Sequence, residues 1–199
     1  MTNSLQAYQQ NHGLIELGRS GKNLEELTKG LATPFFLYNA DHIRARYQRM
    51  HEAYQKQNLP VSIHYATKAN CNPRILGLLA SLGAKADVVS LGETELAIQA
   101  GFSAESVLFS GVAKTVKEIE GALRLGVGQI NVESLGELER IARIAKTMGR
   151  TAQSPVDLGL RLNPNVCPET HPYITTGLQE NKFGLEEPAI REAVGILKS

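Results

Sequence analysis

The sequence has few cysteines, no excess of either charge and no long apolar run. Its 199 residues include two cysteines, Cys71 and Cys167, too few for a disulfide framework and without the C-x-x-C spacing of a metal site. Lys and Arg number 21 against 20 Asp and Glu, which argues against binding to nucleic acid or an anionic membrane by bulk charge. No apolar run approaches the ~20 residues of a membrane span. We therefore expect a cytoplasmic protein with no metal site, no membrane anchor and no nucleic-acid partner.

What the sequence does contain, from about residue 60 onward, is a repeated plan of short apolar strand, capped helix and terminating glycine. Asn72 stands before Pro73 as a helix N-cap, and three S/T-x-x-E patterns fit the capping box, in which two side chains satisfy each other's backbone donors. These patterns are Ser90 with Glu93, Thr115 with Glu118, and Ser134 with Glu137. Glycine tolerates the left-handed conformation that ends a helix, as expected at Gly83, Gly101, Gly126 and Gly149.

The segments between these glycines and caps predict five strands. Regular βα spacing implies that neighbouring strands are parallel, because each crossover returns the chain in the same direction. The expected strands are residues 61–66, 86–89, 106–109, 129–132 and 156–162.

Two architectures accept such repeats, a doubly wound open sheet and the (β/α)8 TIM barrel. No strand is followed by a glycine-rich nucleotide fingerprint, whereas polar residues follow the carboxyl ends of several strands, where barrels build active sites. These residues are Lys68, Asp87, Ser90, Ser110, Glu133, Arg161 and Asn163. We expect an α/β fold holding about the first five βα units of the barrel. Because a closed barrel needs eight units, this barrel is expected to be incomplete.

Lys68 is the leading candidate for chemistry. Strand alternation places His64, Ala66 and Lys68 on one face, directed into the barrel. Partial desolvation at the barrel mouth would favour the neutral amine, which is a nucleophile toward a carbonyl carbon. The alternative is a solvated surface lysine.

Three segments carry a family resemblance. Residues 64–70 (HYATKAN) resemble the Y-A-x-K-A-N segment of the fold-type III pyridoxal-phosphate (PLP) decarboxylases, which have alanine-racemase-like barrels. Residues 86–93 (ADVVSLGE) resemble the second-strand motif of that family. The segments RLNP (161–164), HPYITTG (171–177) and KFG (182–184) resemble its diaminopimelate decarboxylase branch.

The resemblance implies a PLP enzyme that decarboxylates meso-diaminopimelate to L-lysine. Lys68 would hold PLP as a Schiff base, Asp87 would favour a charged nitrogen beside it, and Arg161 would lie near an anionic oxygen of the cofactor. His171 would be a substrate contact in the long connection after Asn163. The residues alone leave open a turn role for Asp87, a structural salt bridge for Arg161 and a solvated position for His171.

The resemblance also implies a domain organisation. Residues 1–34 would form an N-terminal segment that packs on a β domain, and residues 35–199 a partial PLP-binding barrel. Further PLP ligands would follow residue 199, so the chain is expected to be an N-terminal fragment, inactive alone, of a homodimer with shared active sites.

Three other functions remain open on the sequence. One is an ornithine- or arginine-type decarboxylase, and another is a non-catalytic PLP-binding homologue. The third is a Schiff-base aldolase on a similar barrel, in which borohydride would trap substrate on Lys68 without PLP.

Overall fold

The computed structural model describes residues 8–11, 14–17, 23–164 and 183–198. The chain divides into two compact units, residues 1–63 and residues 64–199. The expected boundary after residue 34 concerns the domains of the whole protein and stays a prediction. In the part of the chain that the structure describes, no helix is long and apolar enough to cross a membrane.

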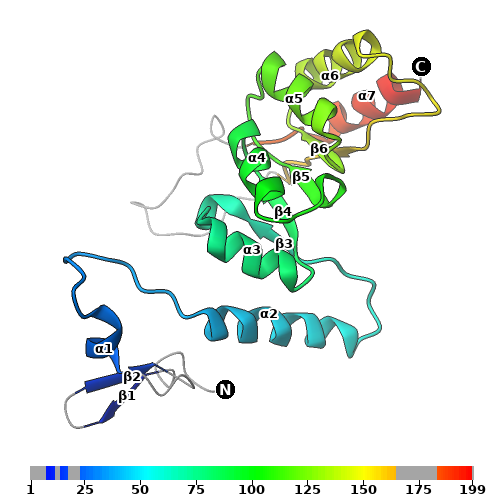
Figure 1. Cartoon of the computed structure of the whole chain (residues 1–199). Coiled ribbons are helices and arrows are strands. Elements are labelled where there is room, and N and C mark those ends of the chain that lie inside the picture. The colour runs from blue at the N-terminus through cyan, green and yellow to red at the C-terminus, as the bar shows by residue number, and fades with distance from the viewer. Residues whose placement is uncertain (1–7, 12–13, 18–22, 165–182, 199) are drawn as a thin grey trace, which may run out of the picture. The chain divides into compact units, whose positions relative to one another are not determined.

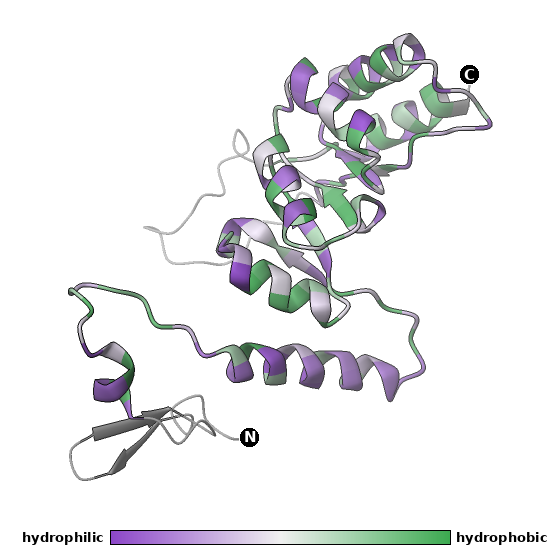
Figure 2. Cartoon of the chain, viewed as in Figure 1, coloured by the Kyte–Doolittle hydropathy of each residue, from purple (hydrophilic) through white to green (hydrophobic). Residues whose placement is uncertain are grey.

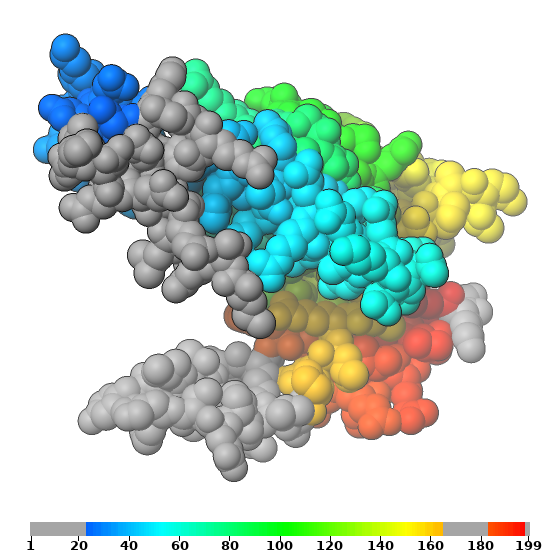
Figure 3. Space-filling model, turned by 90° about the horizontal axis from the view of Figure 1, so that it is seen from below, coloured from blue at the N-terminus to red at the C-terminus, as the bar shows by residue number. Residues whose placement is uncertain are grey.

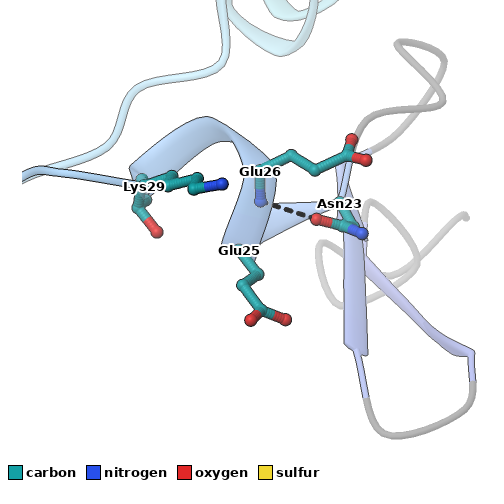
Figure 4. Close-up of a pocket in the computed structure, with 5 residues that line it drawn as sticks. Asn23, Glu25, Glu26 and Lys29 are labelled. Carbon is teal, nitrogen blue, oxygen red and sulfur yellow. Dashed lines mark hydrogen bonds between the residues drawn. The ribbon is translucent and has the colours of Figure 1, made fainter.

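In its described residues, the first unit holds a pair of antiparallel strands and two helices. Strand β1 (Tyr8–Asn11) pairs antiparallel with β2 (Leu14–Leu17). Helix α1 (Leu24–Thr28) begins at Asn23, whose Oδ1 accepts a hydrogen bond from Glu26 N at 2.7 Å (Figure 4). Such a bond satisfies one of the backbone donors that a helix leaves free at its start.

Helix α2 (Ala40–Gln55) is the longest helix of the first unit. It begins at Asn39, whose Oδ1 accepts from His42 N at 3.0 Å. None of its residues is buried, and Figure 2 shows it as mostly hydrophilic. This agrees with a solvated helix rather than a core element.

The second unit contains a parallel sheet whose strand order is the order of the chain, β3-β4-β5-β6-β7 (Figure 1). The expected succession of neighbouring parallel strands is confirmed, and among the described residues the sheet is open, with β3 and β7 at its edges. The first and last strands are shorter than expected. The strands are β3 (His64–Ala66), β4 (Lys85–Val88), β5 (Val107–Phe109), β6 (Gln129–Val132) and β7 (Leu158–Leu160).

Helices and 3-10 turns connect these strands. The helices are α3 (Pro73–Ser81), α4 (Leu91–Gln99), α5 (Val116–Leu125), α6 (Leu135–Thr147) and α7 (Glu187–Lys198), and the turns are η3 (Thr67–Ala69) and η4 (Ala104–Ser106). Helix α7 lies against α6 (Figure 1) and is visible in red on the face drawn in Figure 3. The predicted caps are present: Asn72 accepts from Arg74 N, Ser90 from Glu93 N, Thr115 from Glu118 N and Ser134 from Glu137 N. The glycines at 83, 101, 126 and 149 have φ between +75° and +112°.

One detail of the capping prediction is wrong. Only Thr115 and Glu118 form a complete capping box, in which Glu118 Oε2 also accepts from Thr115 N at 2.9 Å. Glu93 and Glu137 instead accept hydrogen bonds from the amides of Val89 and Glu133, each of which lies one residue before the N-cap serine. Their side chains therefore hold the ends of the preceding strands rather than the helix caps.

The two faces of the sheet differ in polarity. On the outer face the side chains are at most 1% exposed under the helices: Ala86, Val88, Val107, Phe109, Ile130 and Val132. Burial of a large apolar side chain of this kind contributes about 1.5–3 kcal/mol to stability. The alternate residues Lys85, Asp87, Leu108, Gln129 and Asn131 are only half-buried on the inner face. The sheet thus places its core on the outside and its polar groups on the inside, as a barrel does.

Beyond β7 the chain returns to pair with its own strand end. Leu185 N donates to Arg161 O at 2.7 Å, and Asn163 N donates to Leu185 O at 2.8 Å, so that Leu162 and Leu185 form a parallel bridge. Gly184 has φ +101°, and a Cβ there would lie 2.7 Å from Arg161 O. A glycine is therefore required for this close approach.

Candidate functional site

A pocket of about 310 Å³ lies at the carboxyl ends of the parallel strands. Its lining combines residues predicted from the sequence with three that were not: Lys68, Asp87, Val89, Ser110, Asn131, Glu133, Leu160 and Arg161. Ser90 and Asn163, which were also expected at strand ends, do not line it. The polar residues of five successive βα units thus converge on one cavity, as on the catalytic face of a barrel.

Lys68 reaches the pocket from a turn rather than from a strand. Strand β3 ends at Ala66, and Lys68 is the middle residue of the 3-10 turn η3. Its neighbour Thr67 is fully buried, whereas Lys68 itself is exposed. The predicted direction toward the pocket is observed, but the described residues of this chain do not supply the expected desolvation of the amine.

Asp87 presents an unsatisfied carboxylate oxygen to the same pocket. Its Oδ1 is buried and has no hydrogen-bond partner among the residues that the structure describes. An unpaired buried acceptor costs about 1–3 kcal/mol, more when it is charged. Such groups in native structures call for an explanation, and a ligand with a donor nitrogen would satisfy this oxygen.

A side-chain amide network crosses the inner face beside Asp87. Gln129 Nε2 donates to Asn131 Oδ1 at 2.9 Å, and Asn131 Nδ2 donates to Ser110 Oγ at 3.1 Å. The network lies over Gly159 of β7, where an added Cβ would come within 2.3 Å of Asn131 Oδ1 and 2.4 Å of Gln129 Nε2. Sequence reasoning missed Asn131, although inward alternation within the expected strand 129–132 was a signal for it.

Arg161 and Glu133 form an ion pair at the edge of the pocket. Arg161 Nη1 donates to both carboxylate oxygens, at 2.9 and 3.1 Å. Glu133 is 8% exposed and Arg161 45% exposed. The guanidinium also lies 5.5 Å from the centre of the Phe183 ring. The salt bridge that the sequence left open is present, while Nε and Nη2 make no hydrogen bond to the described part of the chain.

His171 and a second hollow, at helix α1, do not belong to the Lys68 pocket as the structure describes it. His171, the candidate substrate contact, lies outside the described residues. A second hollow of about 460 Å³ surrounds helix α1 and is lined by Asn23, Glu25, Glu26, Thr28 and Lys29. Figure 4 shows the Glu25 and Glu26 side chains pointing away from each other. This hollow therefore lacks the convergence of polar groups that the Lys68 pocket has.

Comparison with known proteins assigns the family. Residues 40–198 match a family model described as pyridoxal-dependent decarboxylase, pyridoxal binding domain. The chain belongs to this family. The expected PLP-binding barrel and the PLP cofactor follow from that membership, and the parallel α/β sheet agrees with it.

Within this family, the chain is similar in sequence to diaminopimelate decarboxylases. The chain is 46% identical over 165 residues to diaminopimelate decarboxylase of Helicobacter pylori strain J99, covering 83% of this chain and 39% of that protein. It is 43% identical over 178 residues to the Aquifex aeolicus enzyme, covering 89% and 40%. The chain therefore spans about two fifths of the length of these curated relatives.

Solved structures of the family are also more similar to this chain when they are diaminopimelate decarboxylases. Diaminopimelate decarboxylase of M. jannaschii, solved with L-lysine, matches with a TM-score of 0.82 and 34% identity over 95% of this chain and 44% of that chain. A lysine/ornithine decarboxylase from Vibrio vulnificus, complexed with putrescine, matches with a TM-score of 0.66 and 25% identity over 88% and 41%. The diaminopimelate branch is the more similar of the two.

The pocket residues fit a pyridoxal group. Lys68 offers the amine that an aldehyde requires, and Asp87 offers a buried carboxylate oxygen that lacks a donor. The guanidinium nitrogens of Arg161 that do not contact Glu133 can serve an anionic oxygen. The decarboxylase domain therefore carries a donor set suited to its cofactor.

Proposed function

We propose that the whole protein decarboxylates meso-diaminopimelate to L-lysine with PLP as its cofactor. The observation that carries this proposal is the identity with diaminopimelate decarboxylases across the region that builds the Lys68 pocket. An ornithine- or arginine-type activity has less support, because the lysine/ornithine decarboxylase is less similar to this chain in both sequence and structure.

Lys68 is the proposed attachment point of the cofactor. Its Nζ would hold the cofactor through the aldehyde carbon, with loss of water, and when free would be placed to carry a proton at the mouth of the pocket. When bound, PLP supplies an electron sink for the charge left by departing CO2. The protein supplies position and electrostatics.

Asp87 and Arg161 are proposed to hold the cofactor in place. The unpartnered Asp87 Oδ1 would accept a hydrogen bond from a protonated nitrogen and favour its charged form. Arg161 would contact an anionic oxygen while Glu133 fixes its guanidinium through Nη1. His171 stays a proposed substrate contact.

The substrate assignment is tested with the whole protein loaded with PLP. CO2 release is measured with meso-diaminopimelate, ornithine, arginine and lysine as separate substrates, for the wild type and for Lys68→Ala. Lys85→Ala is the matched control, because Lys85 lies on the inner face of β4 but does not line the pocket.

The proposal expects diaminopimelate to be the preferred substrate, with activity lost in Lys68→Ala and kept in Lys85→Ala. Preference for ornithine or arginine would overturn the substrate. PLP binding without turnover of any of the four would indicate a non-catalytic homologue. Trapping of a substrate by borohydride without PLP would indicate an aldolase.

We also propose a cytoplasmic homodimer with shared active sites. The exposure of Lys68 supports this, because groups beyond the described residues are needed to desolvate the amine. Light scattering on the whole protein should give twice the mass of one chain, and dilution that yields monomers should lower activity. A fully active monomer would contradict the shared site.

A further inference from the structure

The tetrapeptide Ser-Leu-Gly-Glu occurs twice in the sequence, at residues 90–93 and 134–137. Each copy begins two residues after the last residue of a strand that contributes to the pocket, β4 in the first case and β6 in the second. The serines cap helices α4 and α6, but capping does not explain the glutamates, which turn away from the caps. The repeat therefore carries a second role in its last residue.

Glu93 holds the end of β4. Its Oε2 accepts a hydrogen bond from Val89 N at 2.9 Å and also contacts the Thr67 hydroxyl. Thr67 Oγ1 lies 3.0 Å from the backbone oxygen of Asp87. Through these contacts the glutamate links the rim of β4 to the turn that carries Lys68.

Glu137 holds the end of β6 in the same way. Its Oε2 accepts from Glu133 N at 2.7 Å, and its Oε1 accepts from Lys114 Nζ at 3.0 Å. Lys114 Nζ in turn donates to the backbone oxygen of Asn131 at 2.6 Å. The pair is 1% and 5% exposed, and the ammonium lies 5.6 Å from the centre of the Phe109 ring.

The contacts of Glu93 with Val89 and Thr67, and those of Glu137 with Glu133 and Lys114, share one geometry. We call each of these arrangements a bracket. In each, a glutamate accepts from the amide two residues after an inward pocket residue, Asp87 or Asn131. In each, a side chain from the preceding βα unit contacts both that glutamate and the backbone oxygen of the pocket residue. Glu118 occupies the same place in α5, but its carboxylate closes its own helix cap at Thr115 instead of holding a strand end. The bracket is thus specific to the strands that present Asp87 and Asn131.

Stability alone gives little reason to bury Lys114 and Glu137. Replacing a buried ion pair by apolar residues of similar volume is often neutral or stabilising, because both charges must lose their water. What the pair does provide is a fixed backbone at Asn131 and Glu133, and Glu133 in turn fixes Arg161.

We propose that Glu93 and Glu137 are positioning residues for the cofactor site. Glu93 fixes the strand end that presents Asp87, and Glu137, through Lys114, fixes Asn131 and the Glu133–Arg161 pair. The inference rests on PLP binding in this pocket. It predicts that the carboxylates act by accepting backbone hydrogen bonds, since they do not line the pocket themselves.

The test compares two double variants of the whole protein, Lys114→Met/Glu137→Gln and Lys114→Met/Glu137→Leu. Both remove the buried charges and keep similar volumes, but only glutamine retains an oxygen that can accept from Glu133 N. The dissociation constant of PLP is measured by cofactor absorbance, protection of the Glu133 amide by hydrogen exchange, and folding by the thermal midpoint. Glu93→Gln and Glu93→Leu repeat the comparison on β4, and Glu118→Gln and Glu118→Leu are the matched controls.

The leucine variants at 93 and 137 should bind PLP about 10-fold more weakly than their glutamine counterparts, because a 1 Å misplacement in a site can cost up to about 100-fold. Amide protection at Val89 or Glu133 should fall in parallel, and the Glu118 variants should bind PLP like the wild type. Equal PLP affinity of leucine and glutamine at both positions would overturn the proposal, as would failure of both leucine variants to fold, which would make the role structural. Absence of PLP binding by the wild type would instead overturn the proposed function.

Discussion

Asp87 shows at the scale of a single residue how the pocket departs from ordinary packing. Its buried Oδ1 has no donor among the described residues, whereas the amides of Gln129 and Asn131 on the same face bond to each other and to Ser110. A buried carboxylate oxygen without a partner favours function over stability, because it can accept a hydrogen bond that the described residues do not provide.

Asp87→Ala should therefore separate stability from cofactor binding. Removing the unpaired acceptor should leave the thermal midpoint of the PLP-free protein equal to or above that of the wild type. Loss of a charged hydrogen bond, about 1.5–3 kcal/mol, should weaken PLP binding by roughly 10-fold or more. Thermal unfolding and PLP titration measure the two effects. Unchanged PLP affinity would show that Asp87 does not face the cofactor.

Glu118 gives a residue-scale prediction that depends on pH. The hydrogen bond from Thr115 N is the largest influence on the pKa of Glu118. With smaller contributions from the Thr115 hydroxyl, the Leu91 backbone and Lys114, it outweighs desolvation and holds the pKa of the carboxyl below its ordinary value of 4.5. A lowered pKa in the folded state stabilises the fold above the unfolded pKa, and this stabilisation is lost as the pH falls through the folded value. The wild type should thus exceed Glu118→Gln in thermal midpoint at pH 7, and the difference should shrink as the pH falls below 4.5 and through the lowered pKa of Glu118. A constant difference across this range would contradict the assignment.

At the scale of elements, the sequence predicted the features that depend on neighbouring residues but not the contacts between residues far apart in the chain. The strands, the helix caps and the terminating glycines could be predicted because each depends on a few adjacent residues, such as Ser90 with Glu93 N. The Lys114–Glu137 bracket could not, since its partners are far apart in sequence and meet only when β5 and β6 pair. Lys68 was predicted to follow the strand 61–66 with its side chain directed inward by strand alternation, but alternation does not reveal that the 3-10 turn η3 begins at Thr67.

Replacing Gly159 or Gly136 by alanine compares the effect of an added methyl group on the inner face of the sheet with its effect on the outside of a helix. Gly159→Ala places a Cβ within 2.4 Å of the amide ends of Gln129 and Asn131, which must move apart and give up their mutual hydrogen bond, a loss of about 0.5–1.5 kcal/mol. Gly136→Ala, in helix α6, meets nothing within 4 Å and should stabilise by roughly 0.5–1 kcal/mol. Thermal midpoints of the two variants should move in opposite directions. A neutral Gly159→Ala would mean that the amide network does not lie across β7.

At the scale of the whole molecule, the described residues build a donor set but not a closed site. Lys68 is exposed, and the inner face of the sheet is only half-buried. The curated relatives are longer, with this chain spanning 39–40% of the first two. The family resemblance in the Lys68 segment predicted the cofactor where no composition or spacing could, because PLP chemistry depends on a few side chains that many barrels share.

The 199-residue chain alone should therefore fail to decarboxylate diaminopimelate, since water has open access to Lys68. The whole protein, assayed under the same conditions with PLP, provides the comparison. Equal turnover by the isolated chain, as a cooperatively folding monomer, would show that these residues form a complete site.

Attachment of the cofactor to Lys68 is the central claim, and borohydride reduction tests it most directly. The whole protein is loaded with PLP, reduced, digested and analysed by mass spectrometry. The structure and the family predict one modified peptide, containing Lys68, and no stable modification or cofactor absorbance band in Lys68→Ala. Modification of a different lysine, or an unchanged absorbance band in Lys68→Ala, would contradict the account.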